Sequence, residues 1–301
     1  MKRVLTAVVL IPLVLLLVFK GPLWMVFLLL ALVALLATDE YLDIVEKQGI
    51  VPFRKLTMAL VALFFVPVAL PGLSAAQMQS LWAIKCLMPI LAPLVFLAAG
   101  MVTESLPAAL PGAAASYLSI PYIAVGLFAT AIPLFQFNYG ALLVFYLLVV
   151  VWSGDIFAYY VGKNFGKNKL APTISPGKTW EGAIASLVGS ALLGSLIFSN
   201  LSSVFGALAS IHLVQTDSVL GGLPQFRHFS IVMTVLASII INAAAQIGDL
   251  VESMIKRGAN VKDSGSLLPG HGGILDRIDA LLFAAPVGVV TLIATGLYKV
   301  I

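Results

Sequence analysis

Nine stretches of predominantly apolar residues, most of them close to 20 residues long, follow one another along this chain. A helix needs about 20 apolar residues to cross the hydrocarbon core of a bilayer, so the pattern predicts nine transmembrane helices. The predicted fold class is therefore an all-α, polytopic membrane helix bundle. The stretches cover residues 4–19, 22–38, 56–73, 84–101, 113–134, 139–161, 181–200, 228–247 and 278–300.

The composition excludes a water-soluble fold. Hydrophobic residues make up 61% of the 301 residues and charged residues only 10%, whereas a soluble domain is about 25% charged. Disordered, fibrous and disulfide-stapled chains are excluded with it, and the single cysteine, Cys86, has no partner for an intrachain disulfide. The basic residues behind the net charge of +4 lie in short loops between apolar stretches, so membrane lipids rather than nucleic acid are the expected partners.

The distribution of basic residues predicts the orientation of the helices. With nine spans, 13 of the 17 lysines and arginines lie on the side of the N-terminus, and the positive-inside rule then predicts a cytoplasmic N-terminus. Lys2 and Arg3 precede the first apolar stretch, and no small-residue cleavage site follows it, so we interpret that stretch as an uncleaved signal anchor. The expected location is a bacterial inner membrane, with several passes.

Two predicted cytoplasmic loops, 162–180 and 248–277, hold most of the polar residues. We therefore divide the chain into N-terminal transmembrane hairpins over 1–112 and a catalytic transmembrane region over 113–301.

A polar stripe runs from the eighth span into the second loop. Asn242, Gln246, Asp249 and Ser253 are spaced by four, three and four residues, which places them on one face of a helix. Polar side chains at membrane depth are costly unless they meet a partner or a wet cavity. We interpret Asn242 and Gln246 as interhelical hydrogen-bonding residues and Asp249 as a functional residue, because a carboxylate there needs a cation to stay charged.

Acidic and basic residues are interspersed from the second loop into the last span. Asp276 and Asp279 lie in its first turns, where the helix dipole stabilises acids, so one of them could serve only as a cap. Several carboxylates near the membrane surface are better explained by Mg²⁺, which is typically held by one or two carboxylates together with substrate phosphates. The basic residues around them suit the neutralisation of phosphate oxygens: Lys256, Arg257, Lys262 and Arg277.

The sequence His271-Gly272-Gly273 precedes the last span. Glycines permit a tight turn and a close backbone approach, and free amides at a helix N-terminus bind anions. An ordinary connection from loop to helix explains the glycines equally well, and a lone histidine is more often structural.

A second group of polar residues lies upstream. Asp155, Tyr159 and Lys163 share one face at the cytoplasmic end of the sixth span, and Asp155 is either functional or the partner of Lys163 in a buried ion pair. We predict that Ser175 is the N-cap of the next helix and that Pro176 is its first residue. The sequence Gly-Lys-Thr that follows lacks the spaced glycines of a Walker A loop.

These residues together resemble the phosphatidate cytidylyltransferase (CDP-diacylglycerol synthase) family. The family signature is Ser-x-hydrophobic-Lys-Arg, then Lys-Asp and a small residue, then His-Gly-Gly-hydrophobic-x-Asp-Arg-hydrophobic-Asp, and the segment from Ser253 to Asp279 is similar to it at every defined position. The stretch from Asp155 to Gly166 and the sequence Ser-Pro-x-Lys-Thr-x-Glu-Gly also look like family motifs. Gly177 departs from the pattern, because many relatives carry a lysine there.

The resemblance implies the transfer of a cytidylyl group from CTP to phosphatidate in phospholipid biosynthesis, giving CDP-diacylglycerol and pyrophosphate. It implies Mg²⁺ as cofactor and also allows a second cation and a homodimer. Metal ligation is implied for Asp249 and Asp276, with Asp263 as a further ligand or as the residue that orients Lys262. The four basic residues named above would neutralise phosphates. Nucleotide binding or loop positioning is implied for Ser175, Lys178, Thr179, Glu181, His271, Gly272 and Gly273.

Two other functions stay open at this point. A secondary transporter would explain acids inside the membrane, such as Asp155 and Asp249, but not the dense charge of the second loop. A CTP-dependent lipid kinase would transfer the γ-phosphate, and its lipid product would lack cytidine.

Overall fold

The computed structural model describes residues 2–65, 75–103, 105–137, 139–214, 230–267 and 272–299, with the backbone alone over 2–10 and 75–83. Its described elements are helices apart from one two-stranded hairpin. They are α1 (Lys2–Lys20), α2 (Leu23–Lys47), α3 (Arg54–Phe65), α4 (Ala75–Gly100), α5 (Leu106–Ser119), the π-helix η2 (Ile120–Val125), α6 (Gly126–Ala129), α7 (Ile132–Gln136), α8 (Gly140–Phe165), β1 (Lys169–Ala171), β2 (Ser175–Thr179), α9 (Trp180–Ser199), α10 (Leu201–Ser210), α11 (Ile231–Gly258) and α12 (Leu275–Thr295).

The predicted fold class is confirmed: the protein is an all-α polytopic membrane protein. In the described part of the chain, each predicted span overlaps a helix or, for 113–134, a run of helices, while residues 66–73 and 228–229 of the predicted spans lie outside the described residues. Six of the helical stretches in the described part of the chain are long and apolar enough to cross a bilayer: Leu23–Lys47, Leu106–Ala129, Gly140–Phe165, Trp180–Ser199, Ile231–Gly258 and Leu275–Thr295. The count of nine and the cytoplasmic N-terminus stay predictions.

Proline explains why the 113–134 span is a succession of short helical pieces. Pro121 lies in the π-helix η2, which joins α5 to α6 without a break in the helical path. Proline lacks the N–H that would complete the helical ladder, and a π-turn inside an α-helix is one way to absorb such a defect. Pro133 then lies in the first turn of α7, where its missing N–H has no helical partner to lose.

The described chain divides into two compact units. Unit 1 comprises 1–22, 129–250 and 283–301, and unit 2 comprises 23–128 and 251–282. Helices α11 and α12 each contribute residues to both units. The predicted division of the chain at residue 112 into a hairpin region and a catalytic region stays a prediction.

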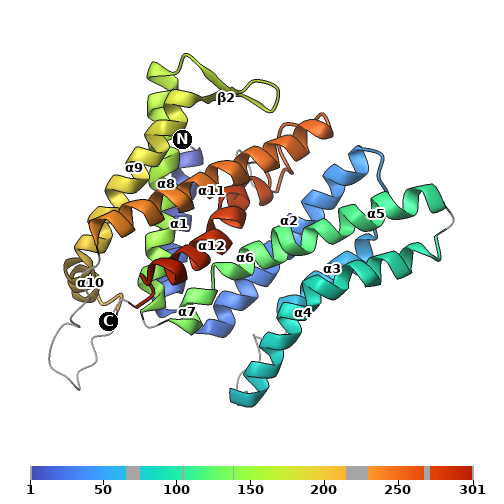
Figure 1. Ribbon diagram of the computed structural model, residues 1–301, viewed down its shortest axis with the longest axis horizontal. Helices are drawn as coiled ribbons and strands as arrows, with labels where there is room; N and C mark the ends of the chain where they lie inside the picture. The colour runs from blue at the N-terminus through green and yellow to red at the C-terminus, as the bar shows by residue number, and fades with distance from the viewer. Residues whose placement is uncertain are drawn as a thin grey trace. The chain divides into compact units, whose positions relative to one another are not determined.

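In unit 1, α8 and α9 run side by side (Figure 1). Small residues make this close approach feasible, as is common between membrane helices. Ser190 Oγ of α9 donates to the carbonyl of Val150 in α8 at 2.7 Å. A Cβ at Gly154 would lie 1.9 Å from Asn242 Nδ2 of α11, so a larger residue at this position of α8 would displace the Asn242 side chain.

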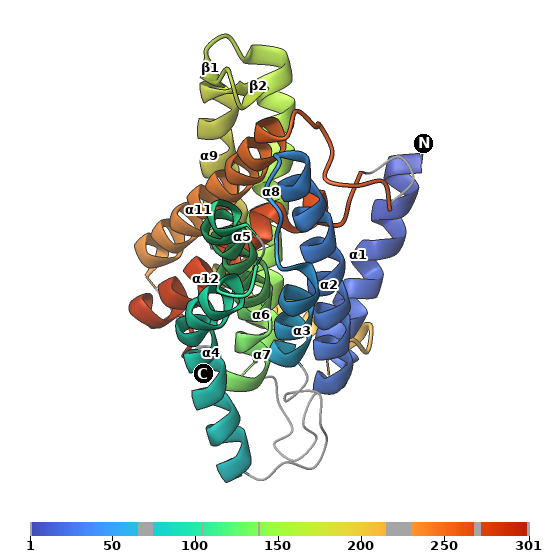
Figure 2. The ribbon, with the colours of Figure 1, turned by 90° about the vertical axis from the view of Figure 1, so that its right-hand side faces the viewer.

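The β-hairpin joins the ends of α8 and α9. Strands β1 and β2 pair antiparallel, with Lys169 opposite Thr179 and Ala171 opposite Ser175. The Trp180 amide donates to the carbonyl of Asn168 at 2.9 Å, which continues the pairing up to the first residue of α9. Both ribbon views show the hairpin projecting from the shared end of α8 and α9 (Figures 1 and 2).

In unit 2, α2 and α3 lie side by side (Figure 2). Their core is aromatic: the ring of Phe128 lies 5.7 Å from that of Phe27, 5.4 Å from that of Phe64 and 6.1 Å from that of Phe65. The Tyr41 hydroxyl donates to the carbonyl of Ala115 at 3.0 Å and so ties α2 to α5.

The turn between α2 and α3 is held by Arg54 at the start of α3. Its guanidinium pairs with Asp39, Asp43 and Glu46, which lie on one face of α2. All three carboxylates are about half exposed, and exposed pairs of this kind contribute little to stability. We therefore treat this group of four residues as a surface feature of the turn.

Candidate active site

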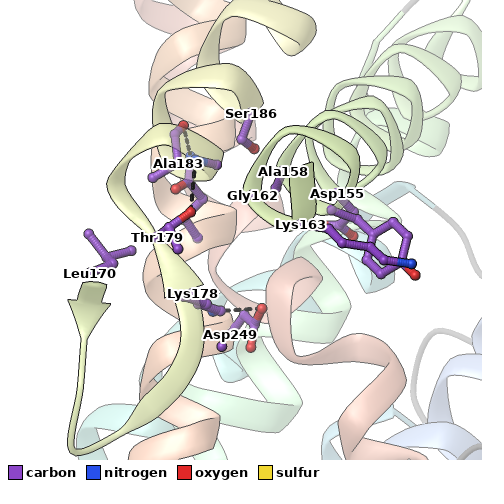
Figure 3. Close-up of a pocket in the computed structure, with 14 residues that line it drawn as sticks. Asp155, Ala158, Gly162, Lys163, Leu170, Lys178, Thr179, Ala183, Ser186 and Asp249 are labelled. Carbon is purple, nitrogen blue, oxygen red and sulfur yellow. Dashed lines mark hydrogen bonds and ion pairs between the residues drawn. The ribbon is translucent and has the colours of Figure 1, made fainter. Parts of the chain in front are cut away.

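Unit 1 contains a cavity of about 580 Å³. Residues of α8, α9, α11 and the β-hairpin line it. Its lining includes Asp155 of α8, Lys178 of β2 and Asp249 of α11. Lys178 Nζ lies 2.7 Å from Asp249 Oδ2, and the two side chains are 26% and 39% exposed. Figure 3 shows Lys178 reaching from the hairpin to Asp249. The structure therefore brings together two predicted site residues that are 71 positions apart in the sequence.

The start of α9 fixes the position of Lys178. Thr179 is the N-cap of α9, and its Oγ1 accepts the amide of Gly182 at 3.2 Å. The carboxylate of Glu181 accepts the amides of Lys167 and Asn168 at 3.1 and 3.2 Å, which binds the loop before β1 to the same helix end. Thr179 and Glu181 thus hold the hairpin in place, and their predicted role in nucleotide binding or loop positioning stays a prediction.

The predicted N-cap at Ser175 is wrong. Ser175 and Pro176 belong to strand β2, and the helix begins five residues later, at Trp180. The sequence Ser-Pro has the local character of a helix start, but pairing with β1 satisfies this segment as a strand and leaves capping to Thr179. The loop predicted over 162–180 is correspondingly shorter, because α8 continues to Phe165, and residues 248–258 of the other predicted loop belong to α11.

Asp155 lines the cavity, and the described ion pairs do not include one between Asp155 and Lys163. It lies within electrostatic range of Asp249 and Lys178, whereas Lys163 Nζ lies 5.6 Å from the ring centroid of Tyr159. Both residues line the cavity from α8 (Figure 3). Of the two interpretations left open by the sequence, the geometry favours a functional carboxylate.

The interpretation of Asn242 and Gln246 as interhelical hydrogen-bonding residues is confirmed. Asn242 Oδ1 accepts from Ser186 Oγ of α9 at 3.0 Å and from Gln246 Nε2 at 2.8 Å. Gln246 Nε2 also donates to the carbonyl of Ala183 at 3.2 Å. The polar stripe of α11 thus binds α9 along its deeper part and reaches the cavity at Asp249.

Unit 2 contains a second charged group, centred on Lys256. Its Nζ lies 2.5 Å from Glu252 Oε2 and 2.5 Å from Asp276 Oδ1, and the three side chains are 12%, 1% and 8% exposed. Glu252 is not aligned for a hydrogen bond with Lys256, so we describe that contact as an ion pair by distance. Predicted residues Lys256 and Asp276 are therefore partners of one another in this buried group.

The second carboxylate oxygen of Asp276 is anchored by the loop before α12. Asp276 Oδ2 accepts from the Ser264 amide at 3.0 Å, from Ser264 Oγ at 3.0 Å and from the Gly273 amide at 2.8 Å. Three donors converge on one oxygen, while the other faces Lys256. The orientation of this carboxylate is thus set by the loop.

Glu40 of α2 holds the same loop from its other side. Its Oε1 accepts the Ile274 amide, and its Oε2 accepts the Leu275 amide and Ser264 Oγ, all at 2.9 Å. A Cβ at Gly273 would lie 2.1 Å from Ser264 Oγ and 2.3 Å from Glu40 Oε2. The second glycine of the His-Gly-Gly sequence is therefore required by the close approach of a buried carboxylate.

Gly272 has a φ of +79°, which favours glycine at the turn that delivers these amides. A Cβ there would also lie 2.5 Å from Asp276 Oδ2. His271 lies outside the described residues, so its predicted role stays a prediction. The loop-to-helix connection is thus built around carboxylates rather than being an ordinary turn.

The remaining predicted residues lie on the exposed surface of unit 2. Arg257 Nη1 donates to the carbonyl of Val261 at 3.1 Å. Lys262, Asp263 and Arg277 are exposed. Their roles in phosphate neutralisation and metal ligation therefore stay predictions.

Sequence reasoning missed Glu40, Glu252 and Ser264. Glu252 was visible in the sequence as an acid one helical turn from Asp249. Glu40 stands at the end of an apolar span, where a carboxylate needs a partner, and this was the available signal. Its partners are 224 to 235 positions away, which no local pattern reveals.

The donor set of the cavity fits a Mg²⁺ ion that also binds phosphates. Within the described ranges, no three or more His, Cys, Asp or Glu side chains form a group that could hold a metal. Asp155 and Asp249 still offer the one or two carboxylates that Mg²⁺ takes when phosphates and waters complete its shell. At Asp276, a cation would have to replace Lys256 at Oδ1.

The sequence is similar to a known protein family and to several curated bacterial proteins. The model of the cytidylyltransferase family matches residues 1–294. A phosphatidate cytidylyltransferase of Haemophilus influenzae is 41% identical over 148 residues, which cover 49% of this chain and 44% of the relative. One from Bacillus subtilis is 40% identical over 149 residues, covering 50% and 46%. An uncharacterised protein of Escherichia coli is 40% identical over 148 residues, covering 49% and 41%.

The alignments thus span about half the length of the curated relatives. The family match, in contrast, extends over nearly all of the sequence and includes both groups of charged residues. The chain belongs to the cytidylyltransferase family.

Proposed function

We propose that this protein transfers the cytidylyl group of CTP to phosphatidate, which gives CDP-diacylglycerol and pyrophosphate. The observation that carries the proposal is the cavity at which Lys178 of the hairpin meets Asp249 of α11. The similarity to phosphatidate cytidylyltransferases supports the choice of substrates. Membrane helices form the cavity, so a lipid headgroup and a water-soluble nucleotide can both reach polar residues at its mouth.

The reaction requires the alignment of two polyanions more than it requires acid–base chemistry. A phosphate oxygen of phosphatidate attacks the α-phosphorus of CTP, a new P–O bond forms, and the bond from the α-phosphorus to the oxygen bridging to the β-phosphorus breaks. The electron pair leaves with pyrophosphate. Since the nucleophile is already an anion, no strong general base is needed. The demand on the protein is charge neutralisation and positioning.

Lys178 is the residue best placed to neutralise a phosphate. Its side chain is 26% exposed and lines the cavity, and its ammonium is paired only with Asp249 in the described contacts. A phosphate oxygen could replace that carboxylate as the partner of Lys178. Asp249 would then be released to a cation. Lys163 lines the same cavity and adds a second positive charge.

We propose that Asp249 holds Mg²⁺ and that Asp155 supports it from α8 in unit 1. Within unit 2, we propose Asp276 and Asp263 as metal ligands. The ion would supply charge neutralisation at the phosphates and the leaving group. Lys256, Arg257, Lys262 and Arg277 would neutralise phosphate oxygens from unit 2. Ser175 and the turn from His271 to Gly273 would contribute to nucleotide positioning. We also propose location in a bacterial inner membrane and assembly as a homodimer.

The test is the mass of the lipid made by the purified protein. Wild type and Asp249→Asn are incubated in detergent micelles with phosphatidate and CTP labelled in the cytosine ring, with and without Mg²⁺. We expect wild type with Mg²⁺ to give a lipid that carries the label and has the mass of CDP-diacylglycerol, together with pyrophosphate. Asp249→Asn should give neither at normal expression.

The other candidate functions give distinct outcomes in the same assay. A lipid kinase would release labelled CDP and leave the lipid without cytidine. A transporter would consume no CTP. Either result would overturn the proposed function.

A further inference from the structure

The chain from Glu40 through Ser264 to Asp276 links α2 to the start of α12. Ser264 Oγ lies 2.9 Å from Glu40 Oε2 and 3.0 Å from Asp276 Oδ2. A hydroxyl has one proton to donate, so one serine hydrogen is shared between two carboxylates. Ser264 is 3% exposed and Glu40 is 9% exposed, so water does not substitute freely for either contact.

Each described hydrogen bond of Glu40 places a donor against one of its carboxylate oxygens. It receives two backbone amides and one hydroxyl, and each is a donor. A carboxylate has acceptor sites on both oxygens and no donor. The glycines at 265 and 273 bring the backbone so near that an added Cβ would lie 2.6 Å and 2.3 Å from its carboxylate oxygens.

We propose that Glu40 is a positioning residue for Asp276. It fixes the amides of Ile274 and Leu275 and the hydroxyl of Ser264, and these in turn fix the loop that anchors Asp276 Oδ2. Asp276 Oδ1 is thereby turned toward Lys256 and toward any cation that displaces it. The inference rests on the proposed function, in which Asp276 takes part in binding the Mg²⁺–nucleotide complex.

Groups that orient a metal-binding carboxylate influence affinity without touching the ligand. Loss of such a group typically lowers metal affinity or activity by about 10 to 100-fold. A merely structural role for Glu40 would lower stability and leave the Mg²⁺ dependence of the folded enzyme unchanged. The Mg²⁺ dependence therefore separates the two roles.

The experiment compares Glu40→Gln, Glu40→Ala and Glu46→Gln in the full-length protein. Glutamine keeps the size of Glu40 but replaces one acceptor oxygen by a donor, so it can hold only part of the three contacts. Glu46 is a matched control on the same helix: it is about half exposed and is paired with Arg54. In the described contacts it does not reach the 264–276 loop.

We expect the Mg²⁺ concentration for half-maximal activity to rise by about 10-fold in Glu40→Gln and by more in Glu40→Ala. The KM for phosphatidate should change little. Glu46→Gln should match wild type in both. Equal Mg²⁺ dependence in Glu40→Gln and wild type would overturn the inference, as would a loss of thermal stability that accounts for all of the lost activity.

Two further readouts do not depend on the reaction alone. Hydrogen exchange of the peptides covering 264–276, measured without Mg²⁺ or CTP, should be faster in Glu40→Gln than in Glu46→Gln, because Ile274 and Leu275 lose acceptors. Ser264→Ala should be less than additive with Glu40→Gln, since the two residues act in one chain of contacts. Unchanged exchange, or full additivity, would contradict the inference.

These outcomes also separate this inference from the proposed function. If wild type makes no CDP-lipid, the proposed function fails, while the exchange experiment still decides whether Glu40 fixes the loop. If wild type is active and Glu40→Gln is indistinguishable from Glu46→Gln, only the inference fails.

Discussion

The two groups of charged residues use their carboxylates in opposite ways. In unit 1, Asp249 has one cationic partner, is 39% exposed and lines a cavity of about 580 Å³. In unit 2, Asp276 is 8% exposed and has both oxygens engaged, one by Lys256 and the other by three donors of its own loop. The two acids for which the family resemblance implies metal ligation thus stand in very different surroundings.

The difference teaches which carboxylate can accept a ligand at little cost. An exposed ion pair beside open space is weak, so a phosphate or a cation can replace either partner. A buried, fully engaged carboxylate is costly to disturb because its partners would be left unpaired. We therefore expect substitutions in the cavity to lower activity alone, and substitutions in the buried group to lower activity and stability together.

The largest combined effect is expected for Asp276→Asn. The change leaves Lys256 with Glu252 as its remaining described partner and places an amide where Lys256 or the loop donors require an acceptor. Breaking a buried ion pair costs about 3 kcal/mol or more, and we expect activity to fall by about 100-fold. Thermal unfolding and CDP-lipid formation measure the two effects. If Asp276→Asn were as stable as wild type, the two groups of charged residues would not differ in their effect on stability, and the comparison would fail.

Asp249→Asn should lower activity by about 100-fold or more with almost no change in stability. The exposed pair with Lys178 contributes at most about 1 kcal/mol, so the unfolding temperature should match that of wild type. The same two assays apply. If Asp249→Asn were destabilised as much as Asp276→Asn, the claim that substitutions in the cavity lower activity alone would be wrong.

Lys178→Gln should raise the KM for CTP and lower kcat/KM by about 10-fold, because one phosphate-neutralising charge is lost from the cavity. Lys169→Gln is the matched control, since Lys169 is exposed on the other strand of the hairpin and is not among the residues lining the cavity. Equal kinetics in the two variants would exclude Lys178 from phosphate binding.

Two glycines, Gly273 of the family signature and Gly177 of the hairpin, test the comparison through the addition of a single methyl group. Gly273→Ala should destabilise by about 1 to 3 kcal/mol, because its Cβ would overlap Ser264 and Glu40. Gly177→Ala should be neutral, since no atom lies within 4 Å of a Cβ there. Denaturant unfolding in detergent measures both, and a destabilised Gly177→Ala would contradict the description of the hairpin.

The smallest effect is expected for Asn242→Ala. Interhelical hydrogen bonds in membrane proteins contribute about 0.6 kcal/mol on average, and Asn242 makes two side-chain contacts with Ser186 and Gln246. Activity should persist, because these contacts lie along the helix pair rather than at the charged residues. A loss of activity beyond the small loss of stability would instead assign Asn242 to the cavity.

Hydropathy was sufficient to predict the fold class and the long apolar helices of the described chain, because a bilayer imposes length and apolar character on each one. The polar stripe of α11 was equally predictable, since Asn242, Gln246 and Asp249 follow helical spacing. The hairpin was not predictable in this way. Its strands are three and five residues long, and Ser-Pro carries a local signal for a helix start that strand pairing overrides.

The candidate site was predictable in its residue types but not in its partnerships. Lys178 and Asp249 were both named from their motifs, yet only the fold pairs them. Glu40 was missed because its described hydrogen bonds are made with a loop more than 200 positions away in the sequence. Local sequence patterns identify polar residues in an apolar segment. They do not identify the distant residues whose contacts position those polar residues.

The β-hairpin between α8 and α9 limits which sequence changes this part of the chain can tolerate. Neighbouring side chains of a strand face opposite sides, so a one-residue slip reverses them all. Lys178 is the penultimate residue of β2, directly before the cap of a membrane helix. A substitution at the tip of the hairpin leaves this register unchanged, whereas a single insertion between Lys178 and Trp180 would turn the ammonium away from its cavity.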